Sequence, residues 1–310
     1  MDCSIWVTEA LTPGDLYVHG VTRVLAAART DFQDMQIVES PVYGKALVLD
    51  GLWQSCTGDE FLYHEPLVHV GSVLHGAPKR ALVLGGGEGA TVRELLRWKT
   101  IETVRMVDID GQVVDACIEH LPEMHQGAFD DPRTDLVIGD ALHALDESDH
   151  DWDLVISDLS DPIEDGPSFR LFTREYYEQV EHALAPGGVF VLQAGPVSPS
   201  EYRRHARLHH TVKAVFPHVA SFWSCAPTYG QPWGFVVARR EPIDVMPDVE
   251  TVDALLRERL DSDLRMFDGR TMLGMLQPPK HVRDAIASET TVFTLAEPPK
   301  FYGKGVAESS

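Results

Sequence analysis

Short apolar segments, each followed by glycine or an acidic residue, alternate with helical patterns from residue 78 onward. The first segment covers residues 80–84, ends in three successive glycines at 85–87, and precedes a helical pattern over 91–98. Such segments are typical of parallel strands whose two faces are both covered by helices. Successive strand–helix units require right-handed crossovers, which place helices on both sides of one sheet. The alternation therefore predicts an α/β fold with a Rossmann-like, methyltransferase-type doubly wound sheet.

The chain before residue 77 and after residue 241 follows different patterns. Residues 1–76 hold short, partly alternating segments followed by turn pairs, which indicates a small N-terminal β-rich domain that ends in a helix over 60–74. Residues 77–241 form the predicted Rossmann-like domain, and 242–310 a helical extension packing on it. The individual strands are expected at 35–40, 45–50, 80–84, 103–107, 135–138, 152–156, 189–193, 220–224 and 234–238, and further helices at 112–120, 202–216, 252–260 and 280–289.

The chain is strongly acidic, with 48 Asp and Glu against 26 Lys and Arg and a formal net charge of −22. This excess repels phosphate backbones and anionic lipid, so neither nucleic acid nor a membrane is an expected partner. The excess of acids favours a cationic ligand. It is explained equally well by a solvated acidic surface or by a salt-adapted host. No 18-residue apolar stretch, signal-peptide pattern or CxxC pair occurs. A cytoplasmic protein without a structural metal site is therefore expected.

In a doubly wound sheet, ligands bind where the strands end, near the point at which the strand order reverses. Gly85, Gly87 and Ala90 fit the G-x-G-x-x-G/A pattern, and Asp108 follows Gly87 by 21 residues, where an acid can hold a ribose diol. Dinucleotides and S-adenosyl compounds both use this scaffold, and a glycine turn can also simply close the strand–helix corner. Glu88 favours an adenosyl-sulfonium ligand, because a carboxylate in this turn would repel a pyrophosphate.

Asp140 follows the third predicted strand of the domain and precedes a helix that begins at Ala141. Its carboxylate can accept a hydrogen bond from the exocyclic amine of an adenine. It can equally cap the helix, and the two roles are compatible.

Two carboxylates, Asp158 and Asp161, follow the fourth predicted strand of the domain within the run Ser157-Asp158-Leu159-Ser160-Asp161-Pro162. With Glu88 and Asp108 they bring several negative charges to one site, which is unfavourable until a polycation fills it. S-adenosylmethionine carries a carboxylate that would be repelled, whereas its decarboxylated form is a dication. The charges thus favour aminopropyl transfer to a polyamine over methyl transfer. The alternative is that these acids cap helices in an ordinary methyltransferase-like domain.

Three motifs, GGGEGATVREL, MVDIDGQVVDAC and SDLSDP, resemble those of the polyamine aminopropyltransferases, the spermidine synthase family. The likeness extends over nearly the whole chain. The segments HQGAFDDPR, DLSDPIEDGPSFRLFT through LQAGP, and the ending FYGKGVA are similar to thermospermine synthases. The resemblance implies transfer of the aminopropyl group of decarboxylated S-adenosylmethionine to spermidine, with release of methylthioadenosine. It also implies a homodimer or homotetramer built partly on the N-terminal β region.

The resemblance also assigns roles to residues. Asp158 matches the catalytic aspartate that takes the proton from the attacking amine, and Glu88 replaces the family's more usual aspartate as partner of the donor's aminopropyl nitrogen. The implied donor site is Gln33, Gly85, Gly87, Glu88, Asp108, Asp140 and Ala141. The implied acceptor channel is Tyr63, His64, Asp161, Gln193 and Tyr229. The reaction so implied needs no metal or other cofactor, because the sulfonium leaves as a neutral thioether.

Other signals are weaker. His205 and His209 stand four residues apart, but without a zincin carboxylate the 202–216 segment is interpreted as an amphipathic surface helix rather than a metal site. The six tryptophans are interpreted as core residues, except that Trp233, beside Tyr229, is a candidate for the acceptor channel.

Three alternative functions stay open. The first is spermidine synthase with putrescine as acceptor, which the Ala226–Tyr229 segment favours because plant thermospermine synthases differ there. The second is an S-adenosylmethionine-dependent methyltransferase. The third is a catalytically silent polyamine-binding or assembly protein, which the presence of Asp158, Tyr63 and Glu88 disfavours.

Overall fold

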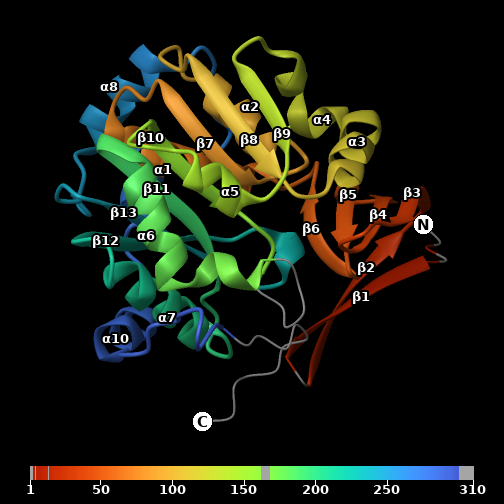
Figure 1. Ribbon diagram of the computed structural model, residues 1–310. Helices are drawn as coiled ribbons and strands as arrows, with labels where there is room; N and C mark the ends of the chain where they lie inside the picture. The colour runs from red at the N-terminus through yellow and green to blue at the C-terminus, as the bar shows by residue number, and fades with distance from the viewer. Residues whose placement is uncertain (1–2, 4, 13, 162–167, 300–310) are drawn as a thin grey trace.

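The computed structural model describes residues 3, 5–12, 14–161 and 168–299, and places a seven-stranded sheet beside two small N-terminal sheets (Figure 1). The thermospermine-like ending at 301–307 and residues 162–167 of the 158–173 motif lie outside the described residues. None of the described helices is both long and apolar enough to cross a lipid bilayer.

The large sheet confirms the predicted doubly wound architecture. Its strands are β7 (Arg80–Gly85), β8 (Thr103–Asp108), β9 (Thr134–Ile138), β10 (Trp152–Asp158), β11 (Leu184–Pro196), β12 (His218–Ser224) and β13 (Trp233–Arg239). Their order in the sheet is β12-β13-β11-β10-β7-β8-β9, and β13 runs antiparallel to both of its neighbours. The order reverses between β7 and β10, so the carboxyl ends of these two strands flank the position where such sheets bind ligands.

Helices cover both faces of this sheet, because successive strand side chains point to opposite sides. Val83 packs with α1 (Phe61–His75), α2 (Ala90–Leu96), α8 (Val249–Arg259) and α9 (Gly269–Met275). Leu82 and Leu84 pack on the other face with α5 (Ala141–Asp146), α6 (Arg174–Ala183) and α7 (Tyr202–Lys213). Both apolar layers are deeply buried, which explains why β7 and β10 are continuous hydrophobic runs.

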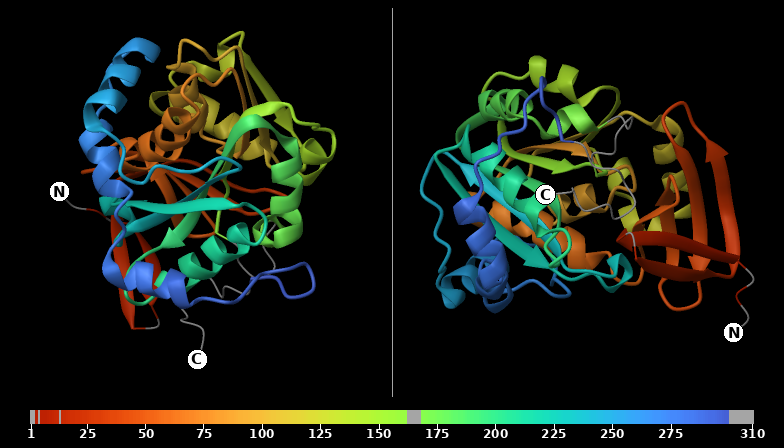
Figure 2. Two further views of the ribbon diagram at one scale, coloured as in Figure 1. Left: turned by 90° about the vertical axis from the view of Figure 1, so that its left-hand side faces the viewer. Right: turned by 90° about the horizontal axis from the view of Figure 1, so that it is seen from below.

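The N-terminal part consists of two antiparallel sheets at one end of the molecule (Figure 2). One holds β1 (Ile5–Thr12) and β2 (Asp15–Val21), and the other β3 (Arg23–Arg29), β4 (Asp34–Ser40), β5 (Gly44–Leu49) and β6 (Leu52–Cys56). The predicted strands at 35–40 and 45–50 are confirmed as β4 and β5. Helix α1, grouped above with residues 1–76, instead packs against β10 and β11 and thus lies with the large sheet.

A separate apolar cluster joins the two parts. Met35 and Ile37 of β4 pack against Val113 and Cys117 of α3 (Gly111–His120), near α4 (Pro122–His125). Because this interface is apolar, it fixes the N-terminal sheets against the edge of the large sheet that carries β8 and β9.

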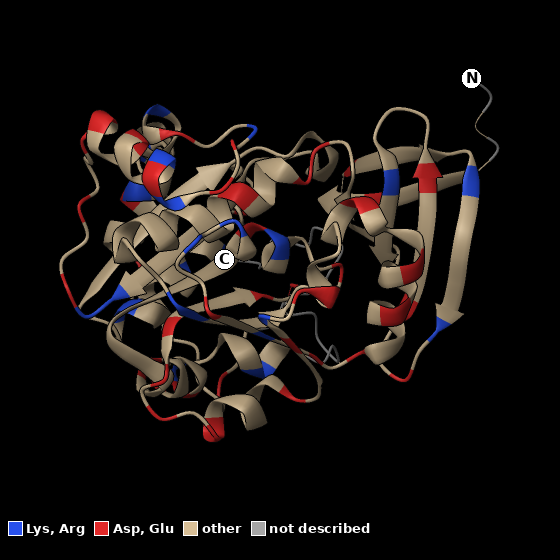
Figure 3. Cartoon of the chain, turned by 90° about the horizontal axis from the view of Figure 1, so that it is seen from above, with Lys and Arg blue, Asp and Glu red and all other residues tan. Residues whose placement is uncertain are grey.

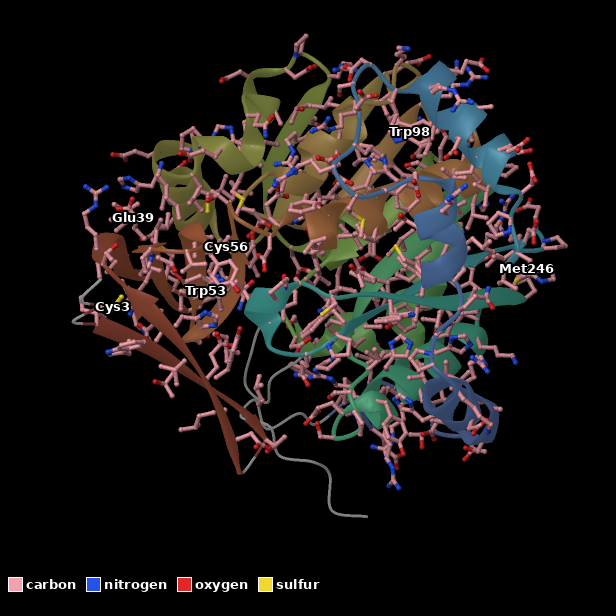
Figure 4. All side chains as sticks on the ribbon, turned by 180° about the vertical axis from the view of Figure 1, so that it is seen from behind. Cys3, Glu39, Trp53, Cys56, Trp98 and Met246 are labelled. Atoms are coloured by element: carbon pink, nitrogen blue, oxygen red, sulfur yellow. The ribbon has the colours of Figure 1, made fainter. Side chains whose placement is uncertain are left out.

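The tryptophans do not all lie in the core. Trp98 is fully buried, and Trp53 lies in the N-terminal core near Cys56 (Figure 4). Trp6 is 59% exposed on β1, so its interpretation as a core residue was wrong.

The expectation that residues 202–216 form a surface helix was wrong in part, because one side of α7 is buried. His205 and His209 are both buried, and each ring has a nitrogen within 3 Å of the Ser221 hydroxyl on β12. Burial lowers the pKa of His205 to about 4 and that of His209 to about 3. The pair therefore packs as neutral imidazoles against the sheet.

The C-terminal segment contacts α7 and the α1 side of the large sheet. Helix α10 (Lys280–Ser288) lies against α7, and α8 and α9 lie against the sheet face covered by α1. The Glu65 carboxylate on α1 accepts hydrogen bonds from the backbone N–H groups of Arg265, Met266 and Phe267, at 2.7 to 2.9 Å. These bonds anchor the segment between α8 and α9 to α1.

Candidate active site

A cavity of about 500 Å³ lies at the carboxyl ends of β7, β8, β9 and β10. Both parts of the chain line it, because Glu9, Leu11, Trp53 and Gln54 reach it from the N-terminal sheets. The predicted site residues that line it are Gln33, Tyr63, Gly85, Gly87, Glu88, Asp108, Asp140, Ala141, Asp158, Asp161, Gln193 and Tyr229. The structure thus brings together side chains that are up to 196 residues apart in the sequence.

The cavity wall is strongly acidic. Among the described residues, eight carboxylates and two guanidinium groups line it. The acids are Glu9, Asp50, Glu88, Asp108, Asp140, Asp158, Asp161 and Glu201, and the arginines are Arg170 and Arg204. Acidic positions also occur over both parts of the molecule (Figure 3), and the eight acids named above line the same cavity. Like charges in one cavity repel each other, so a cationic ligand would lower the energy of the site.

Glycine is required in the turn after β7. Gly85 and Gly86 have φ of +82° and +78°, a region that other residues rarely adopt. A Cβ atom at Gly85 would lie 2.3 Å from the Asp158 carbonyl oxygen, and one at Gly86 would lie 3.0 Å from Asp158 Oδ2. The turn therefore lets the backbone approach Asp158 closely while the chain enters α2.

Two hydroxyl groups hold the Asp158 carboxylate at the end of β10. Tyr63 Oη donates to Oδ1 at 2.7 Å, and Thr91 Oγ1 donates to Oδ2 at 2.6 Å. Burial and the nearby Glu88 raise the pKa of Asp158, although His64 and the two hydroxyl donors oppose this. Burial raises the pKa of Tyr63 well above its usual value, so the phenol stays protonated and keeps donating. An ionised carboxylate accepts more than two hydrogen bonds, so Asp158 retains capacity for a further donor.

His64 does not line the cavity, which corrects its placement in the acceptor channel. The ring is fully buried behind Glu88, with Nε2 2.9 Å from Glu88 Oε1 and Nδ1 3.0 Å from Glu60 Oε2. Arg93 donates to the same Glu60 oxygen at 2.8 Å. The ring turns away from the cavity because α1 directs Tyr63 towards Asp158 and the next residue towards α2.

The hydrogen bonds among Glu60, His64 and Glu88 determine the protonation states of His64 and Glu88. Burial opposes protonation of His64, but its hydrogen bonds to Glu60 and Glu88 raise its pKa to about 10. Burial likewise opposes ionisation of Glu88, but the hydrogen bond to His64 leaves the pKa of Glu88 lowered. Glu88 is therefore held as a carboxylate by an imidazolium behind it, and its cavity side can bind a cation.

Asp108, Asp140 and Gln33, which are predicted to bind the donor, all line the cavity. Asp108 Oδ1 accepts the backbone N–H of Asp110 at 2.9 Å, and burial raises the pKa of Asp108 to about 6. Gln33 Nε2 donates to the Asp110 carboxylate at 3.0 Å, which ties the N-terminal sheet to the start of α3. Asp140 Oδ1 accepts the backbone N–H of Leu142 at 2.9 Å, so it does cap α5, as the alternative interpretation predicts.

Asp161, which is predicted to lie in the acceptor channel, also lines the cavity. Its Oδ1 accepts from Gln193 Nε2 at 3.3 Å, and its Oδ2 accepts from Arg204 at 2.8 Å. Trp233 Nε1 donates to Gln193 Oε1 at 3.0 Å, which fixes the amide orientation. The rings of Trp233 and Tyr229 lie 4.9 Å apart, and both line the cavity, as predicted for Trp233.

One family model matches residues 60–246 and describes the spermine/spermidine synthase domain. The chain belongs to this family. A second model, the spermidine synthase tetramerisation domain, matches residues 5–56. The two matches meet just before α1, where the structure also divides the N-terminal sheets from the large sheet.

Similar proteins cover almost the whole chain. A polyamine aminopropyltransferase of Synechococcus sp. is 54% identical over 302 residues, covering 95% of this chain and 97% of the relative. One of Aeropyrum pernix is 44% identical over 295 residues, covering 94% and 93%. A solved spermidine synthase in complex with the transition-state analogue AdoDATO has a TM-score of 0.85 at 28% identity, covering 93% and 97%. A spermidine synthase of Thermotoga maritima has a TM-score of 0.83 at 28% identity, covering 93% and 96%. The resemblance to polyamine aminopropyltransferases is confirmed.

Two groups in this aminopropyltransferase have metal-ligand residue types at short range, among the residues described. Ligand atoms of His64, Glu88 and Asp158 lie within 4.8 Å of one another. Both ring nitrogens of His64 face carboxylates, and its raised pKa keeps both protonated, so neither offers a lone pair to a metal. The other group, Asp149, His150 and His182, is exposed, and none of its three residues lines the cavity.

Several residues of the site were not predicted from the sequence. Glu60 and Arg93 act behind Glu88, Thr91 supports Asp158, and Arg204 pairs with Asp161. Glu60 stands four residues before His64 on one face of α1, a spacing that could have indicated the pair. Arg204 carries no comparable local signal, because its partner lies 43 residues away.

Proposed function

We propose that this polyamine aminopropyltransferase moves the aminopropyl group of decarboxylated S-adenosylmethionine to spermidine, forming thermospermine and methylthioadenosine. The observation that carries the proposal is the closeness of Glu88 and Asp158, with carboxylate oxygens within 4.8 Å at the strand-order reversal. Two carboxylates at this distance, backed by one imidazolium, suit two amine nitrogens brought together for reaction. The curated relatives and the structure with AdoDATO support this chemistry.

The donor fits the half of the cavity around the glycine turn. Asp108 would accept hydrogen bonds from the ribose hydroxyls, with Gln33 beside the nucleoside. Asp140 and Ala141 would contact the adenine, Asp140 alongside its capping role. Glu88 would bind the ammonium group of the aminopropyl arm.

The acceptor nitrogen must lose a proton before it can attack the carbon next to the sulfonium. Asp158 would orient the amine and take that proton, while the Tyr63 oxygen accepts a hydrogen bond from the same nitrogen. A new N–C bond forms as the C–S bond breaks, and the electron pair leaves on a neutral thioether. The protein therefore need not stabilise a charged leaving group, and positioning supplies most of the rate. In this mechanism no metal or other cofactor takes part.

Spermidine is the proposed acceptor because the HQGAFDDPR and LQAGP segments resemble thermospermine synthases. Putrescine is the alternative, favoured by Ala226–Tyr229, whose tyrosine lines the cavity. The two polyamine aminopropyltransferases named above do not separate the two acceptors, since their names specify only a polyamine, whereas both solved structures named above are spermidine synthases.

The test is a product assay with the purified chain. Decarboxylated S-adenosylmethionine is incubated separately with putrescine, spermidine or agmatine, and each product is identified by mass and chromatographic retention. Thermospermine formed faster from spermidine than any product from putrescine supports the proposal. Spermidine formed from putrescine, with spermidine unreactive as an acceptor, assigns the alternative function.

We further propose a homo-oligomer, either a dimer or a tetramer, built on the N-terminal sheets. Ile5, Trp6, Leu16 and Val18 expose apolar side chains on β1 and β2, within the segment that matches the tetramerisation model. Cys3, Cys56, Cys117 and Cys225 are all free thiols, which supports a reducing, cytoplasmic location.

A further inference from the structure

The Glu201 carboxylate lines the cavity, and one of its oxygens has no hydrogen-bond donor among the described residues. Within the part of the chain that is described, Oε1 of Glu201 is buried and has no hydrogen-bond partner. The residue stands at the N-cap of α7, yet its side chain makes no capping hydrogen bond. A buried acceptor without a donor is unfavourable, so this oxygen needs a donor that the described residues do not supply.

Glu201 lies close to Asp161 and Arg204, and all three side chains line the cavity. Burial and the charge of Asp161 raise the pKa of Glu201, and Arg204 opposes that shift. Asp161 stands three residues after Asp158, so the acidic lining of the cavity includes Asp158, Asp161 and Glu201.

Among the described residues, two acids and one arginine of this group line the cavity, namely Asp161, Glu201 and Arg204. Asp161 and Glu201 together carry two when ionised, and Arg204 supplies one positive charge, placed 2.8 Å from Asp161 Oδ2. The second arginine of the cavity, Arg170, lies over the ring of Phe169. Gly195, where a Cβ would lie 2.7 Å from Arg204 Nε, gives the guanidinium room to lie beside Asp161.

We propose that Glu201 binds the terminal ammonium group of a triamine acceptor and thereby favours spermidine over diamines. This inference rests on the proposed function, since it assumes that the reacting nitrogen lies at Asp158. A diamine bound there extends towards Asp161, whereas a triamine is long enough to continue to Glu201. An ammonium group donates a charge-assisted hydrogen bond, which a carboxylate accepts more strongly than a neutral donor.

The test replaces Glu201 with glutamine, which keeps the shape of the side chain and removes its charge. Steady-state kinetics are measured for wild type and Glu201→Gln with saturating decarboxylated S-adenosylmethionine, using spermidine and putrescine as acceptors. In parallel, calorimetry measures the Kd of each amine for enzyme loaded with methylthioadenosine, which requires no turnover. The matched control is Glu250→Gln, which removes one charge from an exposed position on α8.

We expect the KM and Kd of spermidine to rise roughly 10- to 100-fold in Glu201→Gln, the range for a lost hydrogen bond to a charged group. The kcat with spermidine should stay within about two-fold, because the reacting groups are untouched, and the putrescine values should match those of Glu250→Gln. Unchanged spermidine binding, or an equal loss for putrescine, would overturn the role of Glu201. An unchanged Kd for methylthioadenosine verifies that the variant is folded.

The same measurements separate this inference from the proposed function. Transfer to neither amine by the wild type would reject aminopropyl transfer, while the binding series would still decide whether Glu201 recognises a triamine. Transfer to putrescine alone, with no measurable spermidine binding, would overturn the inference and leave aminopropyl transfer intact.

Discussion

His64 Nε2 lies 2.9 Å from Glu88 Oε1, so a buried imidazolium faces the carboxylate expected to hold the donor's ammonium group. The same ring contacts Glu60 through Nδ1, and Arg93 pairs with Glu60 in turn. Positive and negative side chains thus alternate from the interior to the cavity, in the order Arg93, Glu60, His64 and Glu88.

Replacing Glu60 with glutamine should lower the pKa of His64, because one of the two carboxylates that stabilise the imidazolium is lost. His64 would then lose its proton at a lower pH than in the wild type, and Glu88 would lose part of its ion pair. We expect the KM for the donor to rise several-fold with a smaller change in kcat. NMR titration of the histidine ring, which starts from a pKa of about 10 in the wild type, measures the first effect directly. A ring pKa unaltered by the substitution would show that Glu60 does not set the charge of His64.

The same ring makes stability depend on pH. The pKa of His64 is about 10 in the folded protein and 6.5 as its ordinary value. Its stabilising contribution is therefore fully present below about pH 6.5 and is lost as the pH rises towards 10. The free energy of unfolding of wild type should fall more steeply between pH 7 and 10 than that of His64→Gln, as measured by urea denaturation. Glu60 and Glu88 are ionised throughout this range in both states, so they do not mask the difference. Parallel curves for the two proteins would contradict the assignment.

Asp158→Asn removes the proposed proton acceptor while keeping a side chain of the same size. We expect kcat to fall by roughly two to four orders of magnitude, the range for loss of a general base. Methylthioadenosine should bind the variant within about two-fold of wild type, because the nucleoside site does not use Asp158. An asparagine variant with near-normal turnover would remove Asp158 from the base role.

Asp108 predicts a pH dependence for nucleoside binding. Burial raises its pKa to about 6, and only the ionised form accepts two ribose hydroxyl hydrogen bonds. Affinity for methylthioadenosine should therefore weaken as the pH falls from 7 to 5, and Asp108→Asn should bind weakly with little pH dependence. The neutral thioether is the appropriate probe, because it does not respond to the ionisation of the amine-binding acids. A wild-type affinity that is constant over this range would exclude the proposed ribose contact.

The large sheet could be predicted from the sequence because its central strands are buried on both faces. Segments such as 80–84 and 152–156 are continuous apolar runs that end in glycine or aspartate, and these features identify both the strand and its functional end. Strands β1 and β2 gave no such signal, because Trp6 and Leu16 are exposed and the polar alternation is irregular.

The residues at the strand ends could be predicted from the sequence, whereas the buried ion pairs behind Glu88 could not. Gly85 and Asp108 are the last residues of β7 and β8, and Glu88 stands three residues after β7, so local sequence locates them at the carboxyl edge. The orientation of His64 could not be predicted, because whether its ring faces the cavity or the interior depends on how α1 packs against α2. The same holds for His205, whose burial depends on the contact between α7 and β12.

The acidic cavity is expected to prefer the dication, decarboxylated S-adenosylmethionine, over S-adenosylmethionine. Eight carboxylates against two guanidinium groups line the cavity within the described chain, so a donor without a carboxylate should bind better than one that carries it. The direct measurement is calorimetric titration of the purified protein with decarboxylated S-adenosylmethionine and, separately, with S-adenosylmethionine in the same buffer. We predict that the decarboxylated compound binds at least 10-fold more tightly. Equal affinities, or tighter binding of S-adenosylmethionine, would contradict the central claim.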